Sequence, residues 1–389
     1  MARHAAVENE EELRPTGRHA APEDGADQTA PPEGRRSRAG VLNMVLAMMA
    51  LTLFVVAMIA SYAGAFAKPT LHHLAVAVAG PEQVVDAIKG QNTLAVTTVG
   101  DDAAAWQQVY ERKADAAFVI APSGEMKIYV AGGGGRSVAN AAESVGRGIA
   151  ARAGFAATVQ DVAPPSAGNP SGTVEFYAVI FISIGASVGA TVFGRLMGTV
   201  RKPATFLLRT ITLAAYSALL AAGVTVYTDA VLGALPGHGW QVFATLSLYA
   251  MAVGGAVTGV AAAFGTIASM ALTLFLVIVG NAAAAGPVGR PLLSNFYSTF
   301  TAIVPQGSGV SLLRSVEYFG ANSSQTPIIT LMIWGAAGCV LALGATLGRV
   351  VRIPRTARLN YRAGHDGNDA GIARRERALL RPGLLSPAD

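Results

Sequence analysis

The sequence predicts a polytopic α-helical membrane protein with six spans and a small extracytoplasmic α/β domain between spans one and two. Three observations support this prediction. The 389 residues are 52% hydrophobic and only 14% charged, whereas a soluble protein is about a quarter charged. Several uncharged stretches exceed the roughly 20 residues that a spanning helix needs. One segment between them, residues 68–172, instead has the composition of a water-soluble domain.

The N-terminal part combines a polar tail with the first span. Residues 1–38 are rich in Ala, Glu, Pro, Gly and Arg, which predicts a disordered cytoplasmic tail. The first span follows at 41–67 and ends in "AFA", which resembles a signal-peptidase site. A signal-peptide core is usually about 7–15 residues long, so we expect an uncleaved anchor rather than a cleaved signal.

Residues 68–172 alternate short apolar runs with helical patterns, which is typical of a small α/β domain. Its acidic and basic residues nearly balance. The expected strands are 74–80, 94–100, 116–121, 126–131 and 157–162, and the expected helices are 82–89, 101–114 and 137–153.

Residues 174–348 predict a five-span bundle. The stretch 241–285 is uncharged but too long for one span, so we divide it near Phe264–Thr266 into two. The expected spans are therefore 176–194, 210–228, the two halves of 241–285, and 327–348.

The segment 286–326 precedes the last span and is expected to cap the bundle at the outer leaflet. Its apolar part, 292–304, is too short to cross the bilayer. Pro305, Gly307 and Gly309 are expected to form a turn. Arg314 is expected to pair with Glu317 on a polar flank, or with a backbone carbonyl. The opposite helical face carries Leu312, Leu313, Val316 and Phe319. The alternative is a surface helix that only connects two spans.

Basic residues set the expected orientation. They cluster before the first span, in the loop 194–202, and in the basic tail 349–389. The positive-inside rule places these three clusters in the cytoplasm. We therefore expect a plasma-membrane protein with both termini inside, and with 68–172 and 286–326 outside. The lipid bilayer is its first partner, and the net charge of +5 indicates no nucleic acid.

The residues point to no catalytic, cofactor or metal site, and so to no enzyme. His72 and His73 are adjacent on a strand and would point to opposite faces. The run Gly132–Gly135 is more typical of a flexible turn than of a phosphate cradle, because no Walker sequence accompanies it. The predicted spans carry no ionisable group at mid-depth, which argues against a proton-driven antiporter.

Small residues recur at a spacing that permits close helix approach. Tight packing within one bundle is the first interpretation, and a homodimer seam is the alternative. The pairs are Gly185/Gly189, Gly255/Gly259 and Gly344/Gly348.

The arrangement resembles the type-2 ABC exporter permeases, and most closely their phage-infection-protein-like branch, common in actinobacteria. The likeness covers about 41–350 and departs from the family after Asn281, where alanines follow. The residues that carry it are Leu71, His72, His73, Gly80, Pro81, Gly280, Asn281, Pro305, Gly307, Gly309, Arg314, Tyr318 and Phe319.

This resemblance implies the membrane subunit of an exporter that forms a homodimer or pairs with a related permease. A separate ATP-binding subunit would dock on the cytoplasmic loop 194–202, with Arg195, Arg201 and Lys202 as coupling residues. Cap and pathway residues would include Gly280, Asn281 and the motif from Pro305 to Phe319, with Glu317 beside Arg314. The substrate stays open, and an uncharged bundle is compatible with hydrophobic or lipid-like compounds. The alternative is a non-transporting envelope protein whose external domain acts as receptor or scaffold.

Overall fold

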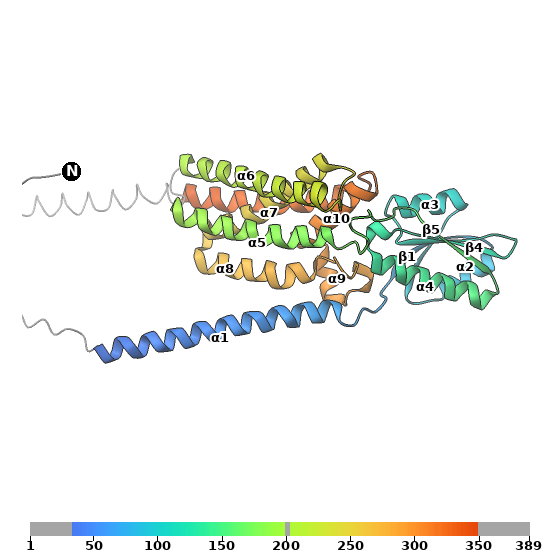
Figure 1. The fold of residues 1–389 in the computed structure, drawn as a ribbon, viewed down its shortest axis with the longest axis horizontal. Helices are drawn as coiled ribbons and strands as arrows, with labels where there is room; N and C mark the ends of the chain where they lie inside the picture. The colour runs from blue at the N-terminus through green and yellow to red at the C-terminus, as the bar shows by residue number, and fades with distance from the viewer. Residues whose placement is uncertain (1–32, 199–202, 349–389) are drawn as a thin grey trace, which may run out of the picture. The chain divides into compact units, whose positions relative to one another are not determined.

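The computed structural model describes residues 33–198 and 203–348 (Figure 1). Most of the predicted N-terminal tail, the residues Arg201 and Lys202, and the predicted tail 349–389 lie outside this range. The chain divides into two compact units at Val55–Val56, within α1 (Glu33–Phe66). In its described part the first unit is one continuous helix, and the second unit holds every other element.

Five strands form one sheet in the order β2-β1-β3-β4-β5, in which β4 runs antiparallel to β3 and the other neighbours are parallel. The predicted strands agree with the observed ones to within two residues. The strands are β1 (Leu74–Ala79), β2 (Leu94–Thr98), β3 (Ala116–Ile120), β4 (Glu125–Val130) and β5 (Ala156–Asp161).

Helices cover both faces of this sheet (Figure 1). They are α2 (Glu82–Lys89), α3 (Asp102–Tyr110) and α4 (Arg136–Ala153). Alternate strand residues point to opposite faces. Val76 and Phe118 accordingly pack with Ile149 of α4 in one core, whereas Ala77 packs with Val109 of α3 in another.

The core under α2 and α4 continues into the helical part of the chain. It includes Ala285, Val288 and Leu293, which belong to the connection between two helices of the bundle. The α/β region, residues 68–172, therefore shares a continuous hydrophobic core with the segment that follows α8.

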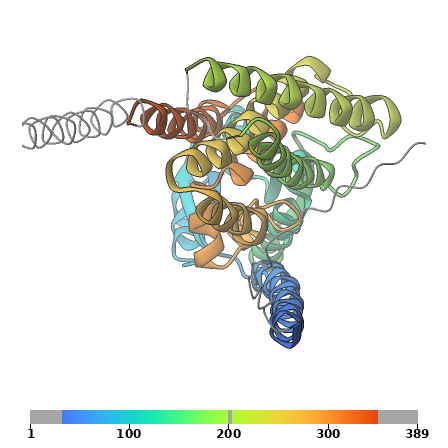
Figure 2. The same ribbon diagram turned by 90° about the vertical axis from the view of Figure 1, so that its left-hand side faces the viewer.

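The helical part contains α5 (Val174–Leu196), α6 (Pro203–Val226) with a π-helical end (Tyr227–Val231), α7 (Gly239–Phe264), α8 (Thr266–Phe275) and a last helix, Gln325–Gly348. Among the described residues, five helices are long and apolar enough to cross a membrane: Gly40–Phe66, Val174–Leu196, Ala204–Val231, Gly239–Phe264 and Gln325–Gly348. Figure 2 looks along α5 to α8.

The fifth predicted span, the second half of 241–285, is shorter than the sequence indicated. The 241–285 stretch breaks at Gly265, whose φ of +89° favours glycine, so the predicted division is confirmed. Its second half is 10 residues of α8 followed by 5 residues of π-helix (Leu276–Gly280). At 1.5 Å per residue this is roughly 22 Å, below the roughly 30 Å of a hydrocarbon core.

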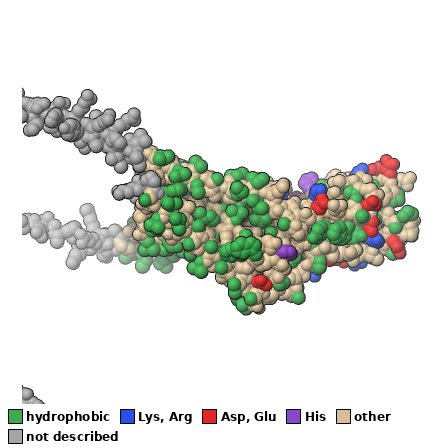
Figure 3. Space-filling view, turned by 90° about the horizontal axis from the view of Figure 1, so that it is seen from above, with side chains coloured by type: hydrophobic (Ala, Val, Ile, Leu, Met, Phe, Trp, Pro, Cys, Tyr) green, Lys and Arg blue, Asp and Glu red, His purple; other side chains and the backbone are tan. Residues whose placement is uncertain are grey.

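Hydrogen bonds tie the segment after β5 to the helical part of the chain. Ser166 donates to the carbonyl of Ala234, and Arg314 donates to the carbonyl of Gly172. In Figure 3 the charged side chains gather over the α/β region, while the visible faces of the helices are largely hydrophobic. Leu219 is 71% exposed and Ile267 is 86% exposed, and such large apolar exposure is typical of a surface that faces lipid.

The predicted turn at Pro305–Gly309 is wrong, because α10 (Pro305–Tyr318) begins at Pro305 itself. Proline is tolerated at the first helical position, where its missing N–H is not needed. Gly307 and Gly309 instead let α10 pack closely against its neighbours. A side chain at Gly309 would meet Tyr249 at 3.1 Å, and one at Gly307 would clash with the carbonyl of Thr301.

Helix α10 is also more deeply buried than the predicted outer-leaflet cap with its polar flank. It packs against α5, α7 and the glycine run after β4. Arg314 is only 4% exposed and Gln306 is fully buried. Figure 1 shows α10 between the long helices and the sheet. It is therefore an internal helix, and neither a turn nor a surface connector.

The predicted glycine pairs differ in their surroundings. Gly255 and Gly259 face the backbone of Gly335 and Gly338, which fits tight packing within one bundle. Gly344 has open space around it. A homodimer seam stays a prediction.

Candidate functional site

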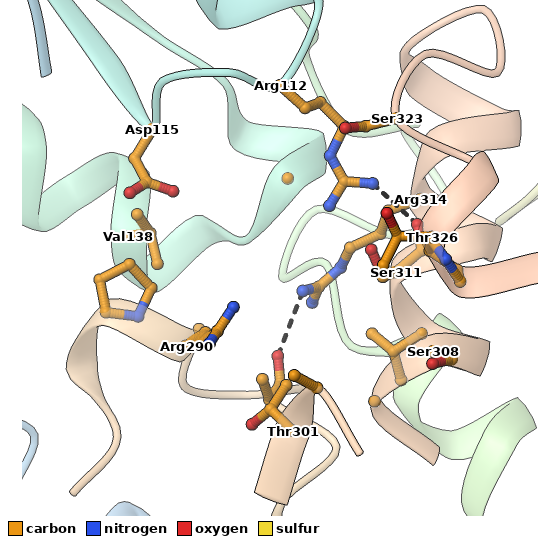
Figure 4. Close-up of a pocket in the computed structure, with 18 of the residues that line it drawn as sticks. Arg112, Asp115, Val138, Arg290, Thr301, Ser308, Ser311, Arg314, Ser323 and Thr326 are labelled. Atoms are coloured by element: carbon orange, nitrogen blue, oxygen red, sulfur yellow. Dashed lines mark hydrogen bonds between the residues drawn. The ribbon is translucent and has the colours of Figure 1, made fainter. Parts of the chain in front are cut away.

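A cavity of about 320 Å³ lies where the α/β region meets the helical part (Figure 4). Its walls come from the end of α3, the glycine run, the segment after α8, α10 and the first turn of the last helix. This volume falls within the range of small-molecule sites. We call it the junction pocket.

Arg314 is the most buried charged residue of the junction pocket. Its guanidinium donates to the carbonyls of Gly286 (2.9 Å), Gly172 (3.1 Å) and Ala285 (3.2 Å). Burial lowers the pKa of Arg314 from its ordinary value. These bonds join α10 to the start of α5 and to the segment after α8, while Nε has no hydrogen-bond partner among the described residues.

Arg112 reaches the same pocket from the α/β region. It donates to the carbonyl of Ser311 (2.7 Å) and to the hydroxyl of Ser315 (2.5 Å). Its guanidinium also lies 5.0 Å from the centre of the Phe319 ring, within cation–π range. Burial, and then the positive charge of Arg314, lowers the pKa of Arg112 to about 10.

Arg290 and Asp115 complete the charged lining (Figure 4). Arg290 opens a short 3₁₀ turn and is exposed. Asp115 accepts a hydrogen bond from the backbone N–H of Ala75 at 3.0 Å. Burial raises the pKa of Asp115, although that bond and the charges of Arg112 and Arg290 act against the rise.

Backbone strain gathers at the junction pocket. Among the described residues, five non-glycine residues have positive φ, and three of them line the pocket: Arg112 (φ 59°), Ala285 (φ 55°) and Ser323 (φ 59°). A non-glycine residue in this conformation costs about 1–3 kcal/mol and is frequent at functional sites.

The glycine run after β4 makes this junction possible. A side chain at Gly133 would meet the Tyr318 ring at 2.5–2.8 Å, and one at Gly134 would meet Phe319 at 3.3 Å. The run includes the 3₁₀ turn Gly132–Gly134. The interpretation as a flexible turn is thus incomplete, because the missing side chains let α10 pack directly against the α/β region.

A buried network lies behind the junction pocket. Tyr318 donates to Glu175 at 2.7 Å, and Asn169 donates to the same carboxylate oxygen at 2.8 Å. Asn169 also accepts from the backbone N–H of Val174 and fixes the start of α5. Burial, and then the Glu175 charge, raises the pKa of Tyr318.

Arg314 and Glu317 do not pair with each other. Arg314 bonds to backbone carbonyls, which was the second of the two expected partners. Glu317 instead accepts from the backbone N–H of Gly237 at 2.8 Å, and His238 lies 4.0 Å from its other oxygen. Although only three residues apart on α10, the two side chains have different neighbours: Arg314 contacts the segments before α5 and after α8, and Glu317 contacts the connection before α7.

The Gly280–Asn281 break lies on the inner face of the bundle. A side chain at Gly280 would clash with Gln306, whose Nε2 donates to Ser183 and to the carbonyl of Leu276, both at 3.0 Å. Asn281 is 1% exposed. The structure therefore brings Gly280 together with α10, but neither Gly280 nor Asn281 lines the junction pocket.

The predicted coupling residues are only partly described. Arg195 is exposed in the last turn of α5. Arg201 and Lys202 lie outside the described residues. Arg209 of α6 donates to the carbonyl of Gly198 at 3.4 Å, so α6 contacts the described part of this loop.

The described histidines, His72, His73 and His238, belong to no metal-binding group. In the described ranges, no three His, Cys, Asp or Glu side chains are grouped so as to hold a metal ion. The backbone N–H of His72 donates to the carbonyl of Pro291 at 2.7 Å, which ties the first strand to the segment after α8.

Sequence reasoning missed Arg112, Asp115, Arg290, Asn169 and Glu175. Arg112 and Asp115 did not stand out in the sequence, because the acidic and basic residues of the α/β region nearly balance. Arg290 did carry a signal, since it is the one Asp, Glu, Lys or Arg between Asp229 and Arg314 in the sequence. An isolated charge in such a long uncharged stretch indicates a specific local role.

No family model, curated protein or solved structure matches this chain. The fold and the junction pocket are therefore the basis for any functional statement. Five apolar helices and an attached α/β region fit a multi-pass membrane protein.

Proposed function

We propose that this chain is the membrane-spanning permease subunit of an ABC-type exporter, driven by a separate ATPase subunit. One observation carries the proposal: the junction pocket takes its walls from both the α/β region and the membrane helices. A bound molecule would touch both parts at once, so its arrival could alter how they pack. The pocket is an entry or exit point in this account.

The proposed topology has six spans, with Thr266–Gly280 as the short one. The α/β region and the connections beside it lie outside, and both termini lie inside. Two points support this. The described connections beside the α/β region share one end of the bundle. In the sequence, basic residues cluster before the first predicted span, in the loop 194–202 and after the last span, and the positive-inside rule assigns these segments to the cytoplasm.

Cysteine labelling in intact cells tests this orientation. In a Cys339→Ala background, single cysteines at Ser123 and Ser294, both exposed, should react with an impermeant maleimide. One at Thr199 should react only after the membrane is permeabilised. Labelling of Thr199 alone in intact cells would reverse the topology.

Coupling to the ATPase is proposed to use the loop 194–202. Among the connections on the proposed cytoplasmic side, this loop has both length and positive charge. The turn at Gly265 between α7 and α8 has neither. A coupling contact needs such a surface beyond the ends of the helices.

The decisive experiment purifies the chain from its native membrane after mild cross-linking and measures vanadate-sensitive ATPase activity. We expect activity to copurify with the wild type and to be lost from an Arg201→Ala/Lys202→Ala variant. Arg355→Ala/Arg358→Ala, in the basic tail, is the matched control and should retain it. Absence of any copurifying ATPase, or full retention by the loop variant, contradicts the proposal.

A receptor or scaffold function is the second candidate, and the shared core favours it. Ala285, Val288 and Leu293 complete a core of the α/β region, and this fixes the region to the bundle. A rigid attachment suits a display or scaffold role. The same ATPase experiment separates the two functions, because a scaffold would copurify without an ATPase.

A further inference from the structure

The charges of the junction pocket do not balance. Its lining carries three arginines, Arg112, Arg290 and Arg314, and a single carboxylate, Asp115. Among the described residues, none of these arginines has a carboxylate within the 4.0 Å of an ion pair. Buried charges are normally paired, so the pocket holds an excess of positive charge.

The nearby carboxylates are engaged elsewhere. Asp115 accepts from the backbone of Ala75. Glu175, whose charge favours the charged form of Arg314, accepts from Tyr318 and Asn169. Glu175 does not line the pocket. Neither carboxylate forms an ion pair with an arginine of the pocket, so an anion entering it meets three positive side chains.

The arginines can still donate. Arg314 is 4% exposed, and its Nε has no acceptor among the described residues. Arg290 is exposed, and within the described range its side chain forms no ion pair. Figure 4 shows it directed into the space between Asp115 and Arg314. Guanidinium groups suit phosphate oxygens because their N–H groups form a planar fork.

Hydroxyl groups and an apolar flank complete the surroundings. The lining also carries the hydroxyl groups of Ser308, Ser311, Ser323 and Thr326. The hydroxyls of Thr301 and Thr330 line it too but donate to carbonyls of their own helices. The last helix contributes its first turn to the pocket, and its exposed Ile329 and Ile333 follow directly. A charged group in the pocket could therefore belong to a molecule whose apolar part lies along this helix.

We propose that the junction pocket binds a phosphate group through Arg112, Arg290 and Arg314, and that this group is the headgroup phosphate of an anionic lipid. Basic pockets between membrane helices bind anionic headgroups on the cytoplasmic side, and the same guanidinium–phosphate chemistry is proposed here for the outer side. The proposal concerns binding alone and holds whether or not the protein transports, so it goes beyond the proposed function. A free phosphate ester shares the same chemistry, and the experiment separates the two sources.

The test measures the thermal unfolding of the purified full-length protein in an uncharged detergent. Three additives are titrated: dioctanoyl phosphatidic acid, dioctanoylglycerol as the uncharged analogue, and inorganic phosphate. A ligand of the folded state raises Tm with its concentration. We expect a saturable rise with phosphatidic acid, none with dioctanoylglycerol, and a rise with inorganic phosphate only at much higher concentration.

Two pocket variants should change this affinity in opposite directions. Arg290→Gln removes an exposed cation without breaking a buried contact, and should weaken phosphatidic acid binding about tenfold. Asp115→Asn removes the negative charge but keeps an acceptor for the N–H of Ala75, and should strengthen binding several-fold. Arg152→Gln, an exposed arginine of α4 outside the pocket, is the matched control and should bind as the wild type.

A purely structural role for the arginines would not give this reciprocal pattern. Equal shifts with phosphatidic acid and dioctanoylglycerol would overturn the proposal. So would unchanged affinity in both Arg290→Gln and Asp115→Asn. If inorganic phosphate saturates at concentrations as low as phosphatidic acid, the phosphate site stands and the lipid source is wrong.

Discussion

The basic residues on the outer surface of the α/β region and those at the junction pocket have different kinds of partner. On the surface, Lys127 pairs with Asp102 at 2.9 Å and Arg147 pairs with Glu143 at 2.8 Å. At the junction, Arg112 is half-buried and Arg314 is buried, and both bond to carbonyls or a hydroxyl. Exposed ion pairs contribute little. Basic residues on the outer surface therefore serve solubility, whereas those at the junction attach the α/β region to the helical part.

The largest effect should come from Arg314→Ala. The change leaves the carbonyls of Gly172, Ala285 and Gly286 without their donor in a buried place. A buried acceptor left without its donor costs about 1–3 kcal/mol, and three are affected, so we expect a much lower Tm in detergent and a poor yield. Arg314→Lys keeps the positive charge but lacks the planar guanidinium, so its Tm should fall between those of the wild type and Arg314→Ala. An Arg314→Ala protein as stable as the wild type would refute the attachment role.

The next effect concerns the glycine run. Gly133→Ala places a methyl group against the ring of Tyr318, and overpacking of this kind costs about 1–3 kcal/mol. Gly148→Ala in α4 is the matched control, because its methyl group meets only the flexible end of Arg152 at 3.9 Å. That change should stabilise by about 0.5–1 kcal/mol. Both variants are measured by thermal unfolding. Similar changes of Tm in Gly133→Ala and Gly148→Ala would contradict the role of the glycine run.

A smaller effect should depend on pH. Burial raises the pKa of Glu317 above its ordinary 4.5, so folding favours the protonated carboxyl. This contribution to stability is fully present below pH 4.5 and is lost as pH rises through the raised value. Glu317→Gln keeps the acceptor for Gly237 without the charge. Its Tm should match the wild type near pH 4 and exceed it by roughly 1–3 °C at pH 8. The opposite trend would show that attraction to His238 outweighs burial.

The smallest effect should be on the surface. Lys127→Ala removes the partner of Asp102, whose pKa is lowered mainly by the hydrogen bond from Lys127. Both side chains are about half exposed, 54% and 45%, so solvent screens the pair. We expect a loss within about 0.5 kcal/mol, measured by thermal unfolding. A loss comparable to that of Arg314→Ala would remove the contrast between surface and junction.

The sequence predicted most elements because their signals are local. Alternating strands around Val76 and the long uncharged stretches each carry their own periodicity. The division at Gly265 was also visible, since glycine ends a helix readily. The turn at Pro305 was wrong because proline and glycine also begin a tightly packed helix, and the sequence does not show what Gly307 and Gly309 will face.

The junction pocket could not be predicted in the same way. Arg112 and Arg314 are far apart in the sequence, and their meeting depends on how α10 packs against the glycine run. Arg314 was singled out, but its partners were set by tertiary packing. Arg290 also carried a sequence signal, because it is the one Asp, Glu, Lys or Arg between Asp229 and Arg314.

The most direct test of the unpaired arginine pocket is a structure of the protein in lipid nanodiscs containing phosphatidic acid, at a resolution that shows side chains. We expect density for a phosphate group between Arg112, Arg290 and Arg314, with Asp115 still bonded to the backbone of Ala75. A direct ion pair between Asp115 and these arginines, or a carboxylate of the chain itself in the phosphate position, would contradict the account.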